Sequence, residues 1–449
     1  MVLLRRTDGA ILRVLLLATT TGYQIRSFGE AARKLGVELV FASDRCDQLD
    51  DPWWDHAIPI RFHEEERSVA AIVAAFPDTP PAGILAVGDR PTLLAARVAA
   101  ALGLPGNPPE AAAASRNKLA SRRAFKAAGM PTPWFQPVPV DRDAYELSSH
   151  VPYPAVVKPL ALSGSRGVMR VDEAAGFVRA FDRLRRLLDS RDVQLERDTA
   201  HQVVMIESFI PGAEFAVEGL LEQGEFRTLA IFDKPDPLDG PFFEETIYLT
   251  PSRAPQETQE RIIAAVRAAI AALGLRHGPV HAECRVDSSG ADLHGPRVFV
   301  LEVAARPIGG LCSKALRFRG DGAEGRGTDE NLISLEELLL RHALGEDVSA
   351  FERERQASGV MMIPIPRRGI YRRVDGVDEA SAVPGVETVQ ITAKPDTMLV
   401  PLPEGKSYLG FVFARGEDAD AVDGALRAAH ACLQFAIDRE VAIVPEPRA

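Results

Sequence analysis

Short apolar runs alternate with amphipathic stretches along the first 110 residues of the chain. The runs at 14–18, 37–42 and 83–87 are typical of buried strands, and helical patterns follow the first and the third of them. Continuous apolar strands that alternate with helices indicate a parallel sheet covered on both faces. We therefore predict an α/β protein whose residues 1–110 form an N-terminal doubly wound parallel-sheet domain.

From 111 to 345 strands dominate, with helices predicted at 111–129, 256–273 and 332–344 and a loop over 317–330. The predicted strands of this region are 153–159, 168–171, 202–209, 214–221, 226–234, 279–286 and 297–303. Beyond 346, further strand-like runs and a last helix at 418–435 predict a small C-terminal α+β domain over 346–449.

The overall composition excludes several classes of protein. The 449 residues carry 63 acidic and 52 basic side chains, a formal net charge of −11, which argues against a nucleic-acid-binding surface. No segment approaches the roughly 20 apolar residues of a membrane span. The four cysteines form no Cys-x-x-Cys pair, so the sequence predicts neither a zinc site nor a disulfide framework and fits a reducing cytoplasm.

Two glutamates on neighbouring strand-like segments are the first candidates for chemistry. Glu283 lies within 279–286 and Glu302 within 297–303, and a polar turn joins the two segments. Adjacent strands would place the carboxylates side by side, where their negative charges repel each other. A divalent cation relieves that repulsion, and Mg²⁺ held by carboxylates and phosphate oxygens is usual in nucleotide-using enzymes. The pair therefore predicts a metal site for phosphoryl chemistry, with Arg306 just beyond it.

Lys158 and the turn that follows it are candidates for phosphate binding. Lys158 ends an apolar run, so its ammonium can reach phosphate oxygens, but such a lysine can equally turn to solvent. The turn consists of Ser163, Gly164, Ser165, Arg166 and Gly167. Its backbone N–H groups can surround an anionic oxygen, although a hairpin turn needs similar residues.

A strand, a proline–glycine turn and a second strand make up 207–215. Here Phe209 can cover a purine ring and Glu214 can accept hydrogen bonds from ribose hydroxyls, unless the segment is only a hairpin with exposed charges. The segment 234–245 combines charge, aromatic rings and prolines. Glu244 and Glu245 at its end are candidates for substrate contact, and a rigid surface loop is the alternative.

Taken in order along the chain, these residues resemble the ATP-grasp fold. The ordered set is Lys118, Val-Val-Lys158-Pro, the Ser-Gly-Ser-Arg-Gly turn, Glu207 followed by Pro-Gly-x-Glu214-Phe, Glu283, and Glu302-x-x-x-Arg306. The resemblance covers about residues 1 to 345, and the C-terminal part is similar to that of ATP-grasp amino-acid ligases. It implies a two-lobed α+β ATP-grasp domain over 111–345.

The resemblance also implies a role for each position that would bind ATP. Lys118 and Lys158 would contact the phosphates, and the 163–167 turn would close over them. Glu207 would lie at the edge of the adenine, with Phe209 nearby.

The remaining positions would hold the ribose, the metal and the substrates. Glu214 would bind the ribose, and Glu283 and Glu302 would bind Mg²⁺, for which Mn²⁺ can substitute. Arg306 would neutralise the transferring phosphate, and Gly309-Gly310 would form part of the substrate wall or only a turn.

One position departs from the family pattern. Many ATP-grasp enzymes have an asparagine two residues after the second metal glutamate, where this chain has Ala304. The number of bound metal ions, one or two, therefore stays open.

The resemblance predicts an ATP-dependent carboxylate–amine ligase that forms an amide or dipeptide through an acyl phosphate. Lys158 and Arg306 would carry catalysis through positioning and charge neutralisation. Small-molecule acids and amines, one of them an amino acid, are the expected substrates, and a homodimer is compatible with the sequence. Two alternatives stay open: a biotin-carboxylase-like subunit and a non-catalytic ATP-binding module.

Overall fold

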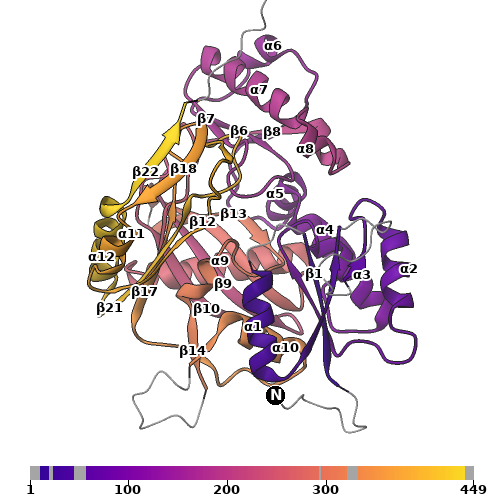
Figure 1. The fold of residues 1–449 in the computed structure, drawn as a ribbon. Helices are drawn as coiled ribbons and strands as arrows, with labels where there is room; N and C mark the ends of the chain where they lie inside the picture. Colours follow the sequence, from indigo (N-terminus) through magenta and orange to yellow (C-terminus); the bar gives the residue numbers. More distant parts are fainter. Residues whose placement is uncertain (1–10, 20–23, 45–56, 293–294, 321–331, 440–449) are drawn as a thin grey trace, which may run out of the picture.

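The computed structural model describes residues 11–19, 24–44, 57–292, 295–320 and 332–439, and the elements below are those of this part of the chain. Four bodies are visible in Figure 1: an N-terminal parallel sheet, a small lobe at the top, a large central sheet, and C-terminal strands beside it. No helix of the described residues is long and apolar enough to cross a bilayer.

The N-terminal sheet has four parallel strands in the order β3-β2-β1-β4. Its elements are β1 (Arg13–Ala18), α1 (Ile25–Leu35), β2 (Glu38–Ser43), β3 (Ile58–Pro59), α2 (Glu65–Ala74), β4 (Gly83–Val87) and α3 (Thr92–Leu102). Val14 and Leu16 of β1 pack in the core that includes Phe28 of α1, whereas Leu15 and Leu17 pack in the core of α2 and α3. Because alternate strand residues point to opposite faces, helices cover both sides, and the predicted doubly covered parallel sheet is confirmed.

The single helix predicted at 111–129 is instead two helices, α4 (Pro109–Ser115) and α5 (Lys118–Ala127). Asn117 caps α5, since its side-chain oxygen accepts hydrogen bonds from the N–H groups of Leu119 and Ala120, both at 3.1 Å. The break places Lys118 in the first turn of α5.

The small lobe is a four-stranded antiparallel sheet in the order β5-β8-β6-β7. Its elements are β5 (Phe135–Pro139), α6 (Ala144–Ser148), β6 (Ala155–Pro159), β7 (Met169–Val171), α7 (Ala174–Leu188), α8 (Arg191–Gln194), a 3₁₀ turn (Thr199–Gln202) and β8 (Val203–Ser208). Helix α7 places Phe177, Phe181 and Leu184 in one core with Val157 of β6, which fixes the strand that carries Lys158.

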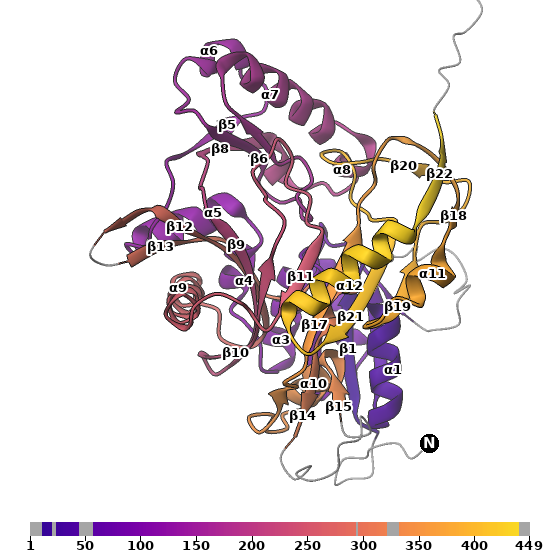
Figure 2. The ribbon, with the colours of Figure 1, turned by 90° about the vertical axis from the view of Figure 1, so that its left-hand side faces the viewer.

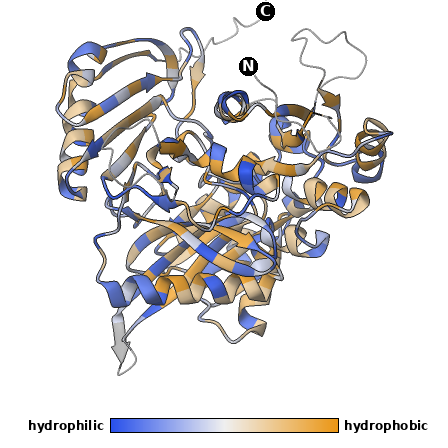
Figure 3. Cartoon of the chain, turned by 90° about the horizontal axis from the view of Figure 1, so that it is seen from below, coloured by the Kyte–Doolittle hydropathy of each residue, from blue (hydrophilic) through white to orange (hydrophobic). Residues whose placement is uncertain are grey.

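The central sheet has eight antiparallel strands in the order β13-β12-β9-β10-β11-β17-β21-β19. They are β9 (Ala213–Glu222), β10 (Glu225–Lys234), β11 (Ile247–Thr250), β12 (Gly278–Asp292), β13 (Gly295–Ala304), β17 (Ala357–Ile363), β19 (Val386–Ile391) and β21 (Gly410–Gly416). Helix α9 (Gln256–Leu273) packs against β12 and β13, and α12 (Ala419–Cys432) against β17 and β21 (Figure 2). Many strand residues are hydrophobic in Figure 3, as a sheet covered by helices requires.

Three of the C-terminal strands, β17, β21 and β19, continue the central sheet. Strand β11 pairs with β17, with Ile247 opposite Met361, so the sheet runs across the predicted domain boundary at 345/346, which stays a prediction. A second, three-stranded sheet of this region, β20-β18-β22, consists of β18 (Gly369–Asp375), β20 (Met398–Leu399) and β22 (Gln434–Asp438), with α11 (Val377–Ser381) before β19.

The predicted loop at 317–330 begins as a strand. Arg317–Arg319 forms β14, which pairs with β15 (Leu332–Ser334) and β16 (Glu352–Arg353), and residues 321–331 lie outside the described part. Helix α10 (Leu335–Ala343) starts three residues later than predicted, because Ser334 and Glu337 form a reciprocal capping box at that point.

Candidate active site

One cavity of about 370 Å³ is lined by residues of the N-terminal sheet, the small lobe, the central sheet and the C-terminal strands. Most residues singled out in the sequence line this cavity: Lys118, Lys158, Ser163, Gly164, Ser165, Glu207, Phe209, Glu214, Glu245, Glu283, Glu302, Arg306, Gly309 and Gly310. Residues more than 190 positions apart in the sequence therefore line the same cavity. Gly167 and Glu244 are not among the lining residues.

Glu283 and Glu302 lie directly opposite each other on β12 and β13, as adjacent strands were expected to place them. Each carboxylate has its own ammonium partner. The Nζ atom of Lys118 lies 3.1 Å from Oε2 of Glu302, and the Nζ atom of Lys234 lies 3.2 Å from Oε1 of Glu283. The two glutamates are thus neighbours in register, and basic side chains offset their charge.

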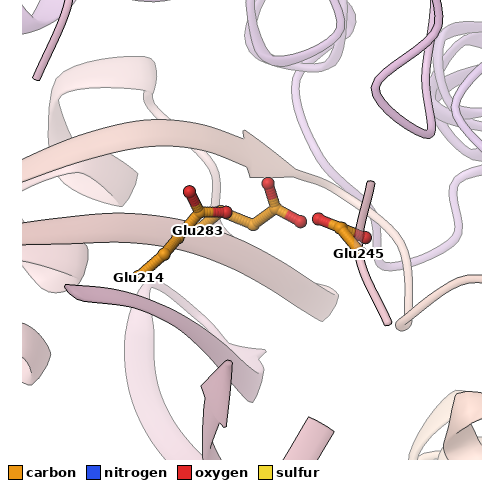
Figure 4. Close-up of side chains that lie close together, drawn as sticks. All are labelled: Glu214, Glu245 and Glu283. Atoms are coloured by element: carbon orange, nitrogen blue, oxygen red, sulfur yellow. The ribbon is translucent and has the colours of Figure 1, made fainter. Parts of the chain in front are cut away.

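Lys234 is the centre of a larger acidic group. Its Nζ also lies 2.8 Å from Glu214 and 2.6 Å from Glu245, and Figure 4 shows Glu214, Glu245 and Glu283 converging from three strands or loops. One oxygen from each of these carboxylates lies within 4.8 Å of the others. Burial lowers the pKa of Lys234, but the three carboxylates more than offset this and hold it well above its ordinary value.

The carboxylates of this group differ in proton affinity. Burial, together with repulsion from Glu283 and Glu214, raises the pKa of Glu245 to about 7. Burial also acts to raise the pKa of Glu283, but Lys234 and His281 outweigh it and hold that pKa well below the ordinary value. His281 lies between two glutamates, with Nδ1 3.0 Å from Glu218 and Nε2 3.5 Å from Glu283.

Lys158 and Glu207 form a buried charged group in the small lobe. Glu207, only 3% exposed, accepts hydrogen bonds from Lys158 and from Nε of Arg122, the latter at 3.2 Å. Burial lowers the pKa of Lys158 to about 8, because repulsion from Arg122 and Lys118 adds to it and Glu207 offsets only part. Lys158 is therefore buried at the cavity and does not turn to solvent, which was the alternative raised from the sequence.

The 163–167 turn has the backbone shape that its small residues suggested. Gly164, Ser165 and Gly167 have positive φ angles of 62°, 55° and 76°. Gly167 packs on α7, since a Cβ atom there would lie 2.9 Å from Leu184, and its N–H donates to the carbonyl of Pro403 at 2.8 Å. The serine end of the turn lines the cavity, whereas the Gly167 end attaches it to α7 and to the C-terminal region.

Phe209 lies among cationic side chains. The guanidinium carbons of Arg170 and Arg285 are 4.2 and 5.2 Å from the centre of its ring, and Phe243 lies 6.4 Å away in a stacked arrangement. Arg285 also donates from Nε to Glu214 at 2.8 Å, so Glu214 is held by Lys234 on one oxygen and Arg285 on the other.

Arg306 follows β13 and reaches the N-terminal sheet. It donates from Nε and Nη2 to the two carboxylate oxygens of Asp89, at 2.8 and 3.0 Å. Burial lowers the pKa of Arg306, but Asp89 and Glu302 raise it further than burial lowers it.

Asp89 and Arg285 line the cavity but were not candidates in the sequence. Lys234 was noted only as the first residue of the 234–245 segment, although it contacts three of the lining carboxylates. Lys234 ends an apolar strand-like run as Lys158 does, so the same signal would have found it. His281, Glu283 and Arg285 alternate along one strand and so share a face, which period-2 spacing predicts. Nothing in the local pattern around Asp89 indicated its partner, because Arg306 lies 217 residues away.

Family profiles match three parts of the chain. The profile described as ATP-grasp domain matches residues 151–315, the ATP-grasp N-terminal domain matches 29–106, and L-amino acid ligase C-terminal domain 2 matches 361–438. The chain belongs to the ATP-grasp superfamily of ligases.

Individual relatives add detail to that assignment. The crystal structure of L-amino acid ligase from Bacillus licheniformis is similar with a TM-score of 0.77 and 26% identity, covering 95% of this chain and 99% of that one. The alanine–anticapsin ligase of Bacillus subtilis is 27% identical over 197 residues, 41% of each chain. The D-alanine–D-alanine ligase of Aromatoleum aromaticum is 30% identical over 168 residues, 37% of this chain and 50% of that protein.

Proposed function

We propose that this protein joins a carboxylate to an amine, at least one of them from an amino acid, through an acyl phosphate, with release of ADP and phosphate. The observation that carries the proposal is the convergence of Lys118, Lys158, Glu302 and Arg306 in one cavity. The names of the relatives support amino-acid substrates, because an L-amino acid ligase, an alanine–anticapsin ligase and a D-alanine–D-alanine ligase are among them.

Lys158 of the small lobe and Lys118 of α5 supply the cations for the ATP phosphates. Lys158 and Lys118 line the cavity together with Ser163–Ser165, whose backbone includes two consecutive residues with positive φ. Ammonium groups and backbone N–H groups are the donors that phosphate oxygens require. Phe209 and Val156 line the same cavity and offer apolar surface for the purine, and Glu207 would lie at its edge.

The oxygen donors of the central sheet fit a divalent metal. Glu283 and Glu302 are opposed in register, and Glu214 and Glu245 are close to the first of them, so the donor set consists of the hard carboxylate oxygens that Mg²⁺ prefers. When bound with ATP, Mg²⁺ would neutralise charge on the phosphate oxygens. Ala304 offers no side-chain oxygen as a ligand, so the proposal needs only one ion, held by Glu283 and Glu302.

The chemistry then needs no covalent group of the protein. A carboxylate oxygen of the substrate attacks the γ-phosphorus of ATP, the bond from that phosphorus to the bridging oxygen breaks, and ADP leaves. The amine nitrogen attacks the acyl carbon, the bond from that carbon to the phosphate oxygen breaks, and the amine loses a proton as phosphate departs. Arg306 and Lys158 hold the negative charge of the transferring phosphate, so that positioning and electrostatics carry the reaction.

The substrates would occupy the cavity near Gly309-Gly310 and Glu245. Glu245 lines the cavity, and because its pKa is about 7 its carboxyl group is partly ionised at neutral pH, which suits the ammonium group of an amino acid. Glu244 lies beside it in sequence but not on the cavity wall, and a contact through it would need the 234–245 segment to move.

The test is to supply MgATP with amino acids in pairs and to measure ADP, phosphate and the coupled product by mass spectrometry. We expect one or more pairs to release ADP and phosphate above the ATP-only background, with amide formed in equal amount. Release of AMP and pyrophosphate would reject the acyl-phosphate route. Turnover that depends on bicarbonate and biotin would favour a carboxylase, and binding of ATP with no turnover in any mixture would favour a binding module.

A further inference from the structure

Two contacts join the N-terminal sheet to the segment that carries Arg306. Asp89 follows β4 at the carboxyl end of the parallel sheet and accepts two hydrogen bonds from the Arg306 guanidinium, at 2.8 and 3.0 Å. The side chain of Gln24 donates to the carbonyl of Ile308, and the N–H of Ile308 donates to Glu218 at 3.0 Å. The backbone just after Arg306 is therefore held from both sides.

Asp89 and Pro307 use only part of the hydrogen-bonding capacity of the Arg306 guanidinium. A guanidinium has five N–H donors in a rigid plane. Asp89 takes Nε and one donor of Nη2, and the carbonyl of Pro307 accepts from Nη1 at 3.0 Å. Among the described residues the guanidinium makes no further hydrogen bond, so one donor on Nη1 and one on Nη2 are left for two oxygens of a phosphate.

We propose that Asp89 is a positioning residue of the ligase reaction, which orients the Arg306 guanidinium toward the transferring phosphate. The inference rests on the proposed function, since it assigns Arg306 to that phosphate. Both side chains line the cavity and are largely buried, 17% and 11% exposed, so the pair is held in a fixed arrangement at the reaction site. The N-terminal sheet thus contributes an aligning group to a site whose cations and carboxylates come mostly from the other parts of the chain.

A positioning role for Asp89 predicts kinetic changes that a purely structural role would not cause. A fixed guanidinium matters most when charge develops on the phosphate, so loss of Asp89 should lower kcat far more than it raises the KM for ATP. A loose guanidinium should also protect the acyl phosphate less well, so that water hydrolyses more of it before the amine attacks.

The experiment compares Asp89→Asn with Asp198→Asn in the full-length protein. Asp198 forms a comparable ion pair outside the cavity, with Arg116 at 2.7 Å and side chains 22% and 20% exposed. For Asp89→Asn we expect kcat to fall roughly 10- to 100-fold, as for other residues that orient a primary ligand, a KM for ATP within about threefold of the wild type, and more phosphate released per amide formed. Asp198→Asn should leave kcat, KM and this ratio near wild-type values.

Vanadate binding measures the role of Asp89 independently of turnover. With the wild type, vanadate as a phosphate mimic should bind in the presence of MgADP, and Asp89→Asn should weaken vanadate binding at least tenfold while MgADP affinity is kept. Equal loss of both affinities, or an unchanged kcat and product ratio, would overturn the assignment of Asp89. If the wild-type protein forms no amide with any pair of substrates while vanadate still binds in an Asp89-dependent manner, the proposed reaction fails and the positioning contact stands.

Discussion

The two charged groups that face the cavity have opposite balances. In the small lobe, one carboxylate, Glu207, is shared by two cations, Lys158 and Arg122. In the central sheet, one ammonium, Lys234, is shared by three carboxylates. The first arrangement places two cations around one carboxylate, which suits phosphate. The second gathers three carboxylates, which Arg285 and His281 contact as well, and so supplies the oxygen ligands that suit a metal ion.

This difference in charge indicates where each partner of a metal–nucleotide complex would be held. A phosphate group near Lys158 would complete a charge balance that Glu207 only half supplies. A divalent cation near Glu283 would relieve the repulsion that adds to burial in raising the pKa of Glu245. The position of both groups at one cavity supports the proposed ligase reaction, which neither group would support alone.

The largest loss of activity is expected on replacing Glu302, which lies opposite Glu283 of the acidic group. Glu302→Gln replaces a charged oxygen with a carbonyl, and we expect turnover to fall by roughly 10²- to 10³-fold or more while the chain stays folded. Release of ADP at saturating Mg²⁺ measures it, with circular dichroism to show folding. Glu225→Gln, at the exposed start of β10, serves as the control and should retain full activity. Near-normal rates for Glu302→Gln would remove Glu302 from the metal site.

In the basic group, replacement of Lys158 should weaken the binding of ATP. Lys158→Ala removes a charge-assisted contact to phosphate, which we expect to cost about 1.5–3 kcal/mol, or roughly 10- to 150-fold in the dissociation constant of ATP. Isothermal titration calorimetry with MgATP would measure this. Lys126→Ala, on the exposed face of α5, is the matched control. An unchanged ATP affinity in Lys158→Ala would place the phosphates elsewhere.

The pH dependence of ATP binding gives a second test of the contact between Lys158 and ATP. The pKa of Lys158 is lowered to about 8, so the ammonium loses its proton as pH rises through that value and ATP affinity should decline above it. The decline is expected to approach about tenfold per pH unit. Lys158→Arg keeps its charge over this range, so its affinity, whatever its absolute value, should vary much less between pH 7.5 and 9.5. Parallel pH curves for the two proteins would contradict the assignment.

The smallest effect is expected at Glu245. Its pKa is raised to about 7 in the folded state, so folding favours the protonated form. The stabilising contribution is present below the unfolded-state pKa near 4.5 and is lost as pH rises to about 7, at a cost of at most about 1.4 kcal/mol per pH unit. Urea unfolding without divalent metal should show a larger loss of stability from pH 5 to 7.5 in wild type than in Glu245→Gln. A loss of the same size in the two proteins would show that Glu245 is not under this strain.

Much of the fold was predictable because local patterns repeat what the tertiary structure needs. The apolar runs at 14–18 and 83–87 match β1 and β4, and the helix predicted at 256–273 matches α9 residue by residue. Errors came where one residue changed the local geometry, as at Asn117, which caps a new helix just after α4 ends at Ser115. The sheet that joins β11 to β17 was not predictable, since strand pairing across 100 residues leaves no local trace.

The candidate site shows the same division. Lys118, Lys158, Glu207, Glu214, Glu283, Glu302 and Arg306 could be chosen from their order and spacing. Their partners could not, because Arg122 reaches Glu207, and Lys234 reaches three glutamates, only after separate strands and helices have packed together.

The types of element, the ATP-grasp resemblance and the set of charged residues available for ATP and metal follow from the amino-acid sequence. These depend on periodicity and on residue chemistry, which are local. The tertiary structure alone decided how the charges are shared, with Lys158 held at a lowered pKa, Glu245 at a raised one, and Arg306 bound to Asp89. Burial and the distances between charges set those properties, and both arise only when distant segments come together.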